Sequence, residues 1–172
     1  MPELSFDEIN DWNKFEELVA AFFRSLMSSN EKHFQDVTVK PSGVGSDGGK
    51  DILVDFTISD YIKQFTRTWV IQCKFHEENI SPNQLFGVDL PTLIHSHNAC
   101  GYLLICKSRP TTGLTNLFHK LNHQSTHFKY NYEIWSGEEF KGKLISAHPS
   151  IHEQYFPKYY KELKQIDSQA KR

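Results

Sequence analysis

The feature that most constrains this chain is a glycine-rich turn that leads into two strand-like runs, within residues 45–74. The turn contains Gly45, Gly48 and Gly49, and it delivers Asp51 onto the run that follows. Glycine permits positive φ angles and close approach of the backbone, so this composition is typical of a tight turn. The second run ends in Gln-Cys-Lys. The stretch therefore predicts two neighbouring strands that carry polar groups at their ends.

Side-chain alternation assigns these polar groups to faces of the two expected strands. In the first run, residues 51–57, Asp51 points to the side opposite Ile52. In the second run, residues 67–74, Gln72 and Lys74 share a face, whereas the intervening positions point into the core: Trp69, Ile71 and Cys73. Pairing of the runs as a hairpin would bring Asp51, Gln72 and Lys74 together on one face, at one end of the sheet.

The rest of the chain shows a regular alternation of helical and strand patterns. Apolar residues recur at helical spacing over residues 12–27, 81–97 and 111–123, and a capping box at 136–139 opens a further helix to about residue 147. Strand patterns cover residues 36–40, 100–106 and 130–135, and residues 58–66 form a polar connection. Pro91 should kink or split the second helix. This order predicts a mixed α/β domain with a hairpin-rich sheet covered by helices.

Length and charge bound the domain organisation and the partners. A chain of 172 residues suits one core. We expect one domain over residues 1–150 and a C-terminal helical extension over 151–172, with a frayed polar tail after about Ile166. The net charge of −2 excludes a dedicated basic coat for nucleic acid, so any DNA-binding charge must be local or supplied by a partner.

Cysteine usage and hydropathy indicate the compartment. Cys73, Cys100 and Cys106 form no CxxC motif, and this pattern is typical of free thiols in a reducing cytoplasm. The N-terminus has no basic region followed by an apolar stretch, and no run is long enough to span a membrane. We therefore expect a cytoplasmic protein without a membrane partner.

The polar groups at the strand ends suit metal-dependent cleavage of a phosphodiester. Mg²⁺ takes oxygen ligands and keeps several waters, so one or two carboxylates suffice. Asp51 is the expected principal ligand, Gln72 offers its amide oxygen or orients a metal-bound water, and Cys73 offers its backbone carbonyl. Lys74 can hold the attacking water or stabilise charge on the phosphate. The alternative is a weak surface ion pair, but the glycine-rich turn and the apolar run before Lys74 favour the catalytic interpretation.

Three motifs together resemble the Mrr-type branch of the PD-(D/E)xK restriction-endonuclease-like superfamily. They are Phe15-Glu16-Glu17-Leu18-Val19, Gly45-x-Asp47-Gly48-Gly49-x-Asp51 and Val70-Ile71-Gln72-Cys73-Lys74. The resemblance covers residues 12–74 with specific motifs and continues more loosely to about Trp135. In that branch a glutamine commonly replaces the acidic middle residue, as Gln72 does in this sequence.

The resemblance implies site residues and a cofactor. Asp51, Gln72 and Lys74 would be the catalytic core, with Mg²⁺ as the metal and Mn²⁺ as a substitute. Glu16 would be the helix glutamate, because it directly follows Phe15, and Glu17 is the less favoured choice. Asp47 would shape the loop rather than take part in catalysis.

The resemblance also implies an αβββαβ core that cleaves DNA in restriction or antiviral defence. Branch members are often fused to a sensor or ATPase domain, and this chain is interpreted either as a stand-alone effector or as an excised module. The modest charge fits a nuclease that needs a partner or self-association into a homo-oligomer to hold DNA. Two alternatives stay open: a catalytically silent module of the same fold that binds nucleic acid or protein, and a nuclease for RNA or branched DNA.

Other polar clusters were weighed against this site. Nine histidines invite a zinc interpretation, and the best cases are the pair His95 and His97 and the group His119, His123 and His127. The chain lacks finger-type cysteine spacing and an HExxH motif, so surface histidines are favoured. Lys107 and Arg109 are candidates for contacts with a DNA backbone, against solvated loop residues as the alternative.

Overall fold

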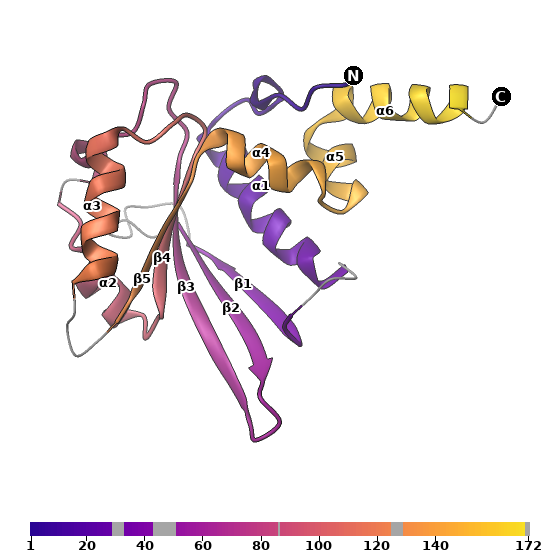
Figure 1. The fold of residues 1–172 in the computed structure, drawn as a ribbon. Coiled ribbons are helices and arrows are strands. Elements are labelled where there is room, and N and C mark those ends of the chain that lie inside the picture. The colour runs from indigo at the N-terminus through magenta and orange to yellow at the C-terminus, as the bar shows by residue number, and fades with distance from the viewer. Residues whose placement is uncertain (29–32, 43–50, 86, 125–128, 171–172) are drawn as a thin grey trace.

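The fold is a five-stranded sheet with helices on both faces (Figure 1). The computed structural model describes residues 1–28, 33–42, 51–85, 87–124 and 129–170. Within these ranges the strands, in chain order, are β1 (Asp36–Pro41), β2 (Ile52–Ser59), β3 (Gln64–Lys74), β4 (Gly101–Cys106) and β5 (Asn131–Trp135). The helical segments are η1 (Phe6–Glu8), α1 (Trp12–Ser25), η2 (Leu26–Ser28), η3 (Pro82–Leu85), α2 (Leu90–Ser96), α3 (Thr112–His123), α4 (Gly137–Ile145), α5 (Pro149–Tyr155) and α6 (Pro157–Ala170).

The sheet combines an antiparallel half with a parallel half. Its strand order is β1-β2-β3-β4-β5; β1, β2 and β3 pair antiparallel, and β3, β4 and β5 pair parallel. The first half is built from adjacent strands, whereas the parallel strands need helical crossovers between them. The predicted element order and the mixed α/β class are therefore confirmed.

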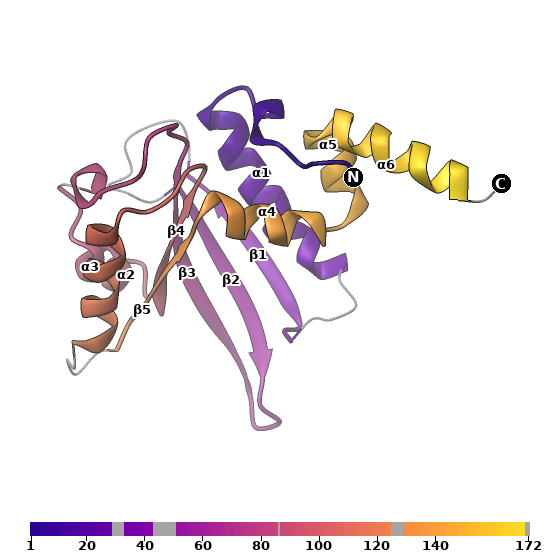
Figure 2. The ribbon, with the colours of Figure 1, turned by 45° about the horizontal axis from the view of Figure 1, so that its top comes forward.

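Two hydrophobic clusters cover the two faces of the sheet (Figures 1 and 2). On one face, helices α1, α4 and α5 bury residues such as Phe15, Phe140 and Ile151 against Ile71 of β3. On the other face, α2 and α3 pack against residues of the central strands that include Tyr102, Leu104 and Val70. Odd-numbered residues of β3 face the first cluster and even-numbered residues face the second, as the alternation of a strand requires.

Helix starts follow the capping signals in the sequence. The side chain of Asp11 accepts the N–H of Lys14 at 2.8 Å and caps α1. Ser136 and Glu139 form the capping box of α4, with each side chain accepting the other residue's backbone N–H. These polar side chains satisfy backbone donors that the first helical turn leaves unpaired.

The helix expected over residues 81–97 consists of two separate pieces. The 3₁₀ helix η3 ends at Leu85, and Gly87 has a φ of +84°, a conformation that favours glycine. Asp89 then caps α2, with Pro91 at the start of that helix. The prediction that Pro91 kinks or splits one helix is therefore wrong, because the helix is interrupted before the proline. Pro91 lies in the first turn of α2, where no backbone N–H is needed for an intrahelical hydrogen bond.

The polar connection expected over residues 58–66 is wrong, because β2 and β3 continue through it. β2 runs to Ser59, β3 begins at Gln64, and a tight turn joins them. In that turn Oδ1 of Asp60 accepts the N–H groups of Ile62 and Lys63, each at 3.1 Å. An aspartate side chain that accepts backbone N–H groups a few residues further along the chain stabilises a tight turn in this way.

The C-terminal extension is helical and well packed at its start. Ile151, Phe156 and Tyr159 belong to the same hydrophobic cluster as Phe15. The expected fraying after Ile166 is wrong as far as α6 is described, since this helix continues to Ala170. Its polar residues are exposed on a helix rather than in an irregular tail.

Across the described ranges, every helix is too short or too polar to cross a bilayer.

Candidate active site

Asp51 is fixed at the point where β2 begins beside the end of β3. Its backbone N–H donates to the carbonyl of Ile71 at 2.9 Å, which extends the strand pairing by one residue. Its carboxylate oxygen Oδ2 accepts the backbone N–H of Cys73 at 2.6 Å. A charged acceptor makes this a strong hydrogen bond, so it fixes the position of the carboxylate.

The backbone of Cys73 is oriented toward the same place. In a strand, the N–H and C=O of one residue point to the same neighbour, as the paired hydrogen bonds of antiparallel ladders show. Because the N–H of Cys73 meets the side chain of Asp51, its carbonyl also faces the β2 side. Burial raises the pKa of the Cys73 thiol well above its ordinary value, with the Asp51 charge adding to the effect. The thiol is therefore neutral, and the backbone carbonyl oxygen is the atom of Cys73 that can bind a metal ion.

Glu16 approaches the site from α1, whereas Glu17 does not. Burial, followed by the nearby charge of Asp51, raises the pKa of Glu16 to about 7. Glu17 is exposed and forms an ion pair with Lys14 at 3.1 Å. The structure thus brings Glu16 into electrostatic contact with Asp51, and it places Glu17 on the solvent side of the helix.

Gln72 is buried beneath the site and held by a residue of the next strand. Its side chain is only 6% exposed. The hydroxyl of Tyr102, from β4, donates to its amide oxygen Oε1. Burial raises the pKa of Tyr102 well above its ordinary value, and the Asp51 charge adds to this effect, so the tyrosine stays a hydrogen-bond donor. A buried amide held in this way has one preferred orientation.

Lys74 is the last residue of β3 and is half-buried at the same end of the sheet. It shares the face of Gln72, two residues earlier, as the alternation predicts. Burial raises the pKa of Cys106, in β4, to about 12, and the positive charge of Lys74 partly lowers this pKa. The ammonium therefore lies near the ends of both strands.

Together these residues form a set of oxygen donors beside one cation. Asp51 and Glu16 supply carboxylates, Cys73 a carbonyl and Gln72 an amide. Among the described residues no group of three or more His, Cys, Asp or Glu side chains gathers that could hold a metal ion, so backbone and amide oxygens would have to complete the ligand set. Mg²⁺ needs only one or two carboxylates, and the mutual repulsion of Asp51 and Glu16 would be relieved by a divalent cation. The donor set therefore fits Mg²⁺.

The remaining candidates lie elsewhere or have other partners. Lys107 forms an ion pair with Glu77 and lies 4.6 Å from the ring centre of Phe75. Arg109 is exposed next to it, and contact of either residue with DNA remains a prediction. Asp47 and its glycine neighbours fall outside the described residues.

The histidine cluster does not form a zinc site in the part of the chain that is described. His119 and His123 lie on one face of α3 with their Nε2 atoms 3.3 Å apart. His127, the third member of the expected group, lies outside the described residues. A contact between two ring nitrogens is what a surface pair one helical turn apart produces.

Tyr102 is the site residue that the sequence analysis missed. The only signal is a single tyrosine within an otherwise aliphatic strand, Gly-Tyr-Leu-Leu-Ile-Cys. A buried hydroxyl usually needs a hydrogen-bond partner, so its position alone suggests a polar neighbour. Which neighbour it meets depends on the pairing of β3 with β4, which places Tyr102 opposite Val70 and within reach of Gln72, two residues further along β3.

These features define a restriction-endonuclease-like fold. Helix α1 lies beside the start of β2, where the aspartate is found, and the end of β3 carries the glutamine and the lysine. A family model described as "Mrr_cat: Restriction endonuclease" matches residues 8–140. The chain belongs to this restriction endonuclease family. No curated protein matches the chain.

Two solved structures share this fold. One is the DNA modification-dependent restriction endonuclease AspBHI, with a TM-score of 0.55 and 14% identity over 90% of this chain. The other is the MspJI restriction endonuclease in complex with a 27-mer oligonucleotide, with a TM-score of 0.52 and 14% identity over 82% of this chain. This chain spans only 35% and 32% of those two proteins, respectively. The predicted family and fold are thereby confirmed.

Proposed function

We propose that this chain is a Mg²⁺-dependent endonuclease that hydrolyses phosphodiester bonds of DNA, with Mn²⁺ able to replace Mg²⁺. The observation that carries the proposal is the hydrogen bond from the backbone N–H of Cys73 to the Asp51 carboxylate. Gln72 and Lys74 are the neighbours of Cys73 in β3, so their side chains lie close to this carboxylate. Membership of the restriction endonuclease family supports the same reaction class.

Each residue has a role that its position suits. Asp51, the amide oxygen of Gln72 and the carbonyl of Cys73 would hold the metal. A bound Mg²⁺ supplies Lewis-acid stabilisation of the phosphate and lowers the pKa of a bound water. Lys74 places a positive charge where the phosphate gains negative charge, or orients the attacking water. Glu16, with its raised pKa, can accept a proton near neutral pH.

The biological setting follows as part of the proposal. We assign the chain to restriction or antiviral defence in the cytoplasm, where its three free cysteines remain reduced. The solved relatives are about three times longer than the part that this chain matches, so recognition of DNA is proposed to come from an associated sensor, ATPase or DNA-reading domain. Such a partner also supplies the positive charge that a chain of net charge −2 lacks.

The test is cleavage of supercoiled and linear DNA with Mg²⁺ or Mn²⁺, with EDTA and the Lys74→Ala variant as controls. We expect metal-dependent nicking or linearisation that is lost in both controls. Parallel reactions with RNA and branched DNA identify the substrate. Metal-independent binding of DNA without cleavage, in the presence of any partner domain, would instead indicate a catalytically silent module of the same fold.

A further inference from the structure

The hairpin of β2 and β3 protrudes from the sheet as an arm (Figures 1 and 2). Pairing of β2 with β1 ends at Thr57, and pairing of β3 with β4 begins at Trp69. In residues 58–67, here called the hairpin arm, strand pairing therefore stays within β2 and β3: Ile58 pairs with Phe65 and Ser59 with Gln64, and the last two residues pair with Thr57 and Phe56. Among the described residues no strand other than β2 and β3 pairs with the arm, and Nε2 of Gln64 donates to Oε1 of Gln35, just before β1, at 2.5 Å.

The arm has one apolar and one polar face. Phe56 and Trp69 pack on the α1 side of the sheet, so alternation places Ile58 and Phe65 on that side as well. These last two residues are direct cross-strand partners. On the opposite face the cross-strand pairs are Thr57 with Thr66, Ser59 with Gln64 and Asp55 with Thr68. Such a division is typical of a two-stranded ribbon with one covered face.

The tip of the arm adds two exposed apolar side chains. Tyr61 and Ile62 are 106% and 89% exposed, and Phe65 is 36% exposed. Tyr61 has a φ of +72°, which a bulky residue rarely adopts, and the carboxylate of Asp60 holds the turn in place. A turn in this uncommon conformation that presents two large apolar side chains is a candidate contact surface.

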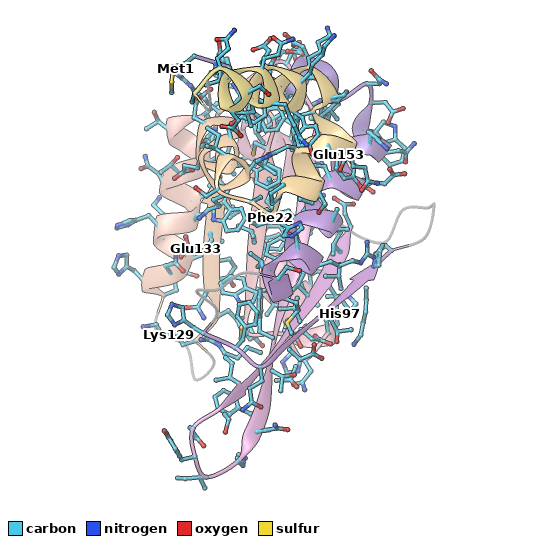
Figure 3. The ribbon with its side chains drawn as sticks, turned by 90° about the vertical axis from the view of Figure 1, so that its right-hand side faces the viewer. Met1, Phe22, His97, Lys129, Glu133 and Glu153 are labelled. Carbon is cyan, nitrogen blue, oxygen red and sulfur yellow. The ribbon has the colours of Figure 1, made fainter. Side chains whose placement is uncertain are left out.

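A matching hollow lies at the base of the arm on the same face. Its volume is about 340 Å³, and its lining includes five aromatic side chains, among them Phe56 and Trp69 of the arm's own strands. Glu133 and Lys143 stand in its wall as the charged residues. Figure 3 looks onto this side, with the arm extending below the labelled Phe22 and Glu133, which also line the hollow.

We propose that the apolar face of the arm is the contact between two copies of this chain, with the tip of each arm in the hollow of the other. Two ribbons laid face to face and antiparallel bring each tip to the base of its partner, at the ~10 Å spacing of packed sheets. The arrangement is reciprocal, so it closes as a two-fold dimer instead of growing into a filament.

Size and charge agree with a second copy as the occupant. An aromatic ring and an aliphatic side chain from each tip, with the surfaces that receive them, remove on the order of 1,000 Å² from water, which is about the lower limit for a biological interface and suits a weak dimer. Lys63 at the tip would meet Glu133 in the wall of the hollow. DNA is a poorer occupant, because the exposed side chains of the tip are mainly apolar and few cations, such as Lys63 and Arg67, face phosphates.

The contact surface itself does not depend on the proposed nuclease activity. The functional consequence of the dimer does rest on the proposed nuclease activity. Two copies bring two candidate sites into one assembly, one for each strand of a duplex.

The first test is the oligomeric state by light scattering and sedimentation over a wide range of protein concentration. We expect the wild-type chain to be a concentration-dependent dimer, and Tyr61→Ser and Ile62→Ser to be monomers with unchanged circular dichroism. Ile166→Ser, which replaces an aliphatic residue of α6 with 48% exposure, is the matched control and should remain a dimer. A wild-type chain that stays monomeric, or a dimer indifferent to Tyr61→Ser, overturns the proposal.

The second test exchanges charges across the proposed contact. Lys63→Glu and Glu133→Lys should each weaken the dimer about tenfold, and the double variant should recover most of that loss. Additive losses in the double variant would show that the two residues do not meet. If Tyr61→Ser leaves the chain's oligomeric state unchanged but weakens its binding to a DNA duplex, the arm is a DNA contact and the dimer proposal is wrong.

Discussion

The two ends of the β2–β3 pair behave as opposites. At one end, Asp51 and Gln72 are held by a backbone N–H and by the hydroxyl of Tyr102, and helices cover both faces of the sheet. At the other end, Tyr61 and Ile62 are exposed to solvent on a turn that the side chain of Asp60 stabilises. The same two strands thus carry a rigid polar site and an exposed apolar arm.

The difference shows that the buried end of one hairpin suits a candidate catalytic site and its exposed end suits a binding surface. A candidate catalytic group must be held in one orientation, and this requires neighbours on every side. A surface that binds a partner must instead stay accessible until the partner arrives. Substitutions at the two ends should therefore affect different measurements, and four experiments test this, in descending order of expected effect.

Lys74→Ala should lower the rate of DNA cleavage by at least about 10²–10³-fold, because it removes the positive charge next to the phosphate. The rate of nicking of supercoiled DNA under saturating Mg²⁺ measures the loss. Lys120→Ala, on the exposed face of α3, serves as the control and should cleave like the wild type. Cleavage by Lys74→Ala at the wild-type rate would exclude the proposed site.

Ile71→Ala and Ile62→Ala compare the two ends through stability. Ile71 is 0% exposed, so its truncation leaves a cavity and should lower the free energy of unfolding by about 2–5 kcal/mol. Ile62 is 89% exposed, and its truncation should change that free energy by less than about 0.5 kcal/mol. Urea unfolding at low protein concentration makes the comparison, and equal losses would show that the arm is buried in the isolated chain.

Tyr102→Phe should lower the free energy of unfolding by about 1–3 kcal/mol, because it leaves the buried amide oxygen of Gln72 without its donor. Loss of the fixed amide orientation should also raise the Mg²⁺ concentration needed for half-maximal binding, measured by calorimetry. Tyr132→Phe, in the same hydrophobic cluster, is the matched control. An unchanged Mg²⁺ titration for Tyr102→Phe would show that Gln72 does not take part in holding the metal.

Glu16→Gln should stabilise the metal-free protein at pH 8 but not at pH 4. The pKa of about 7 in the folded state lies above the ordinary carboxyl value, so the stability that Glu16 contributes is complete at low pH and is lost as pH rises through 7. For a half-exposed group, solvent screening reduces the effect to about 1 kcal/mol, or about 2–4 °C in Tm.

Thermal unfolding in EDTA at the two pH values measures this difference, and Glu17→Gln provides the matched control. Addition of Mg²⁺ at pH 8 should stabilise the wild type more than Glu16→Gln, because the cation offsets the repulsion between Glu16 and Asp51. A Glu16→Gln variant that is no more stable than the wild type at pH 8 would show that this carboxyl is not strained in the fold.

The sequence by itself determined the order of elements and the family. Helical periodicity, glycine-rich turns and capping residues act over a few positions, so they predict α1, β4 and the capping box of α4. The same local patterns located Asp51, Gln72 and Lys74 at the ends of their strands. Each of these inferences needs only neighbours in the chain.

Only the tertiary structure decided which groups meet across strands and helices. The choice of Glu16 over Glu17 as the neighbour of Asp51 depends on how α1 lies over the sheet, and the contact of Tyr102 with Gln72 depends on the register of β4. The continuation of β2 and β3 into the arm was missed because Ile58 and Phe65 are seven positions apart in a mostly polar stretch and form one apolar face only when the strands pair. Burial and pairing are properties of the folded chain, and no local pattern contains them.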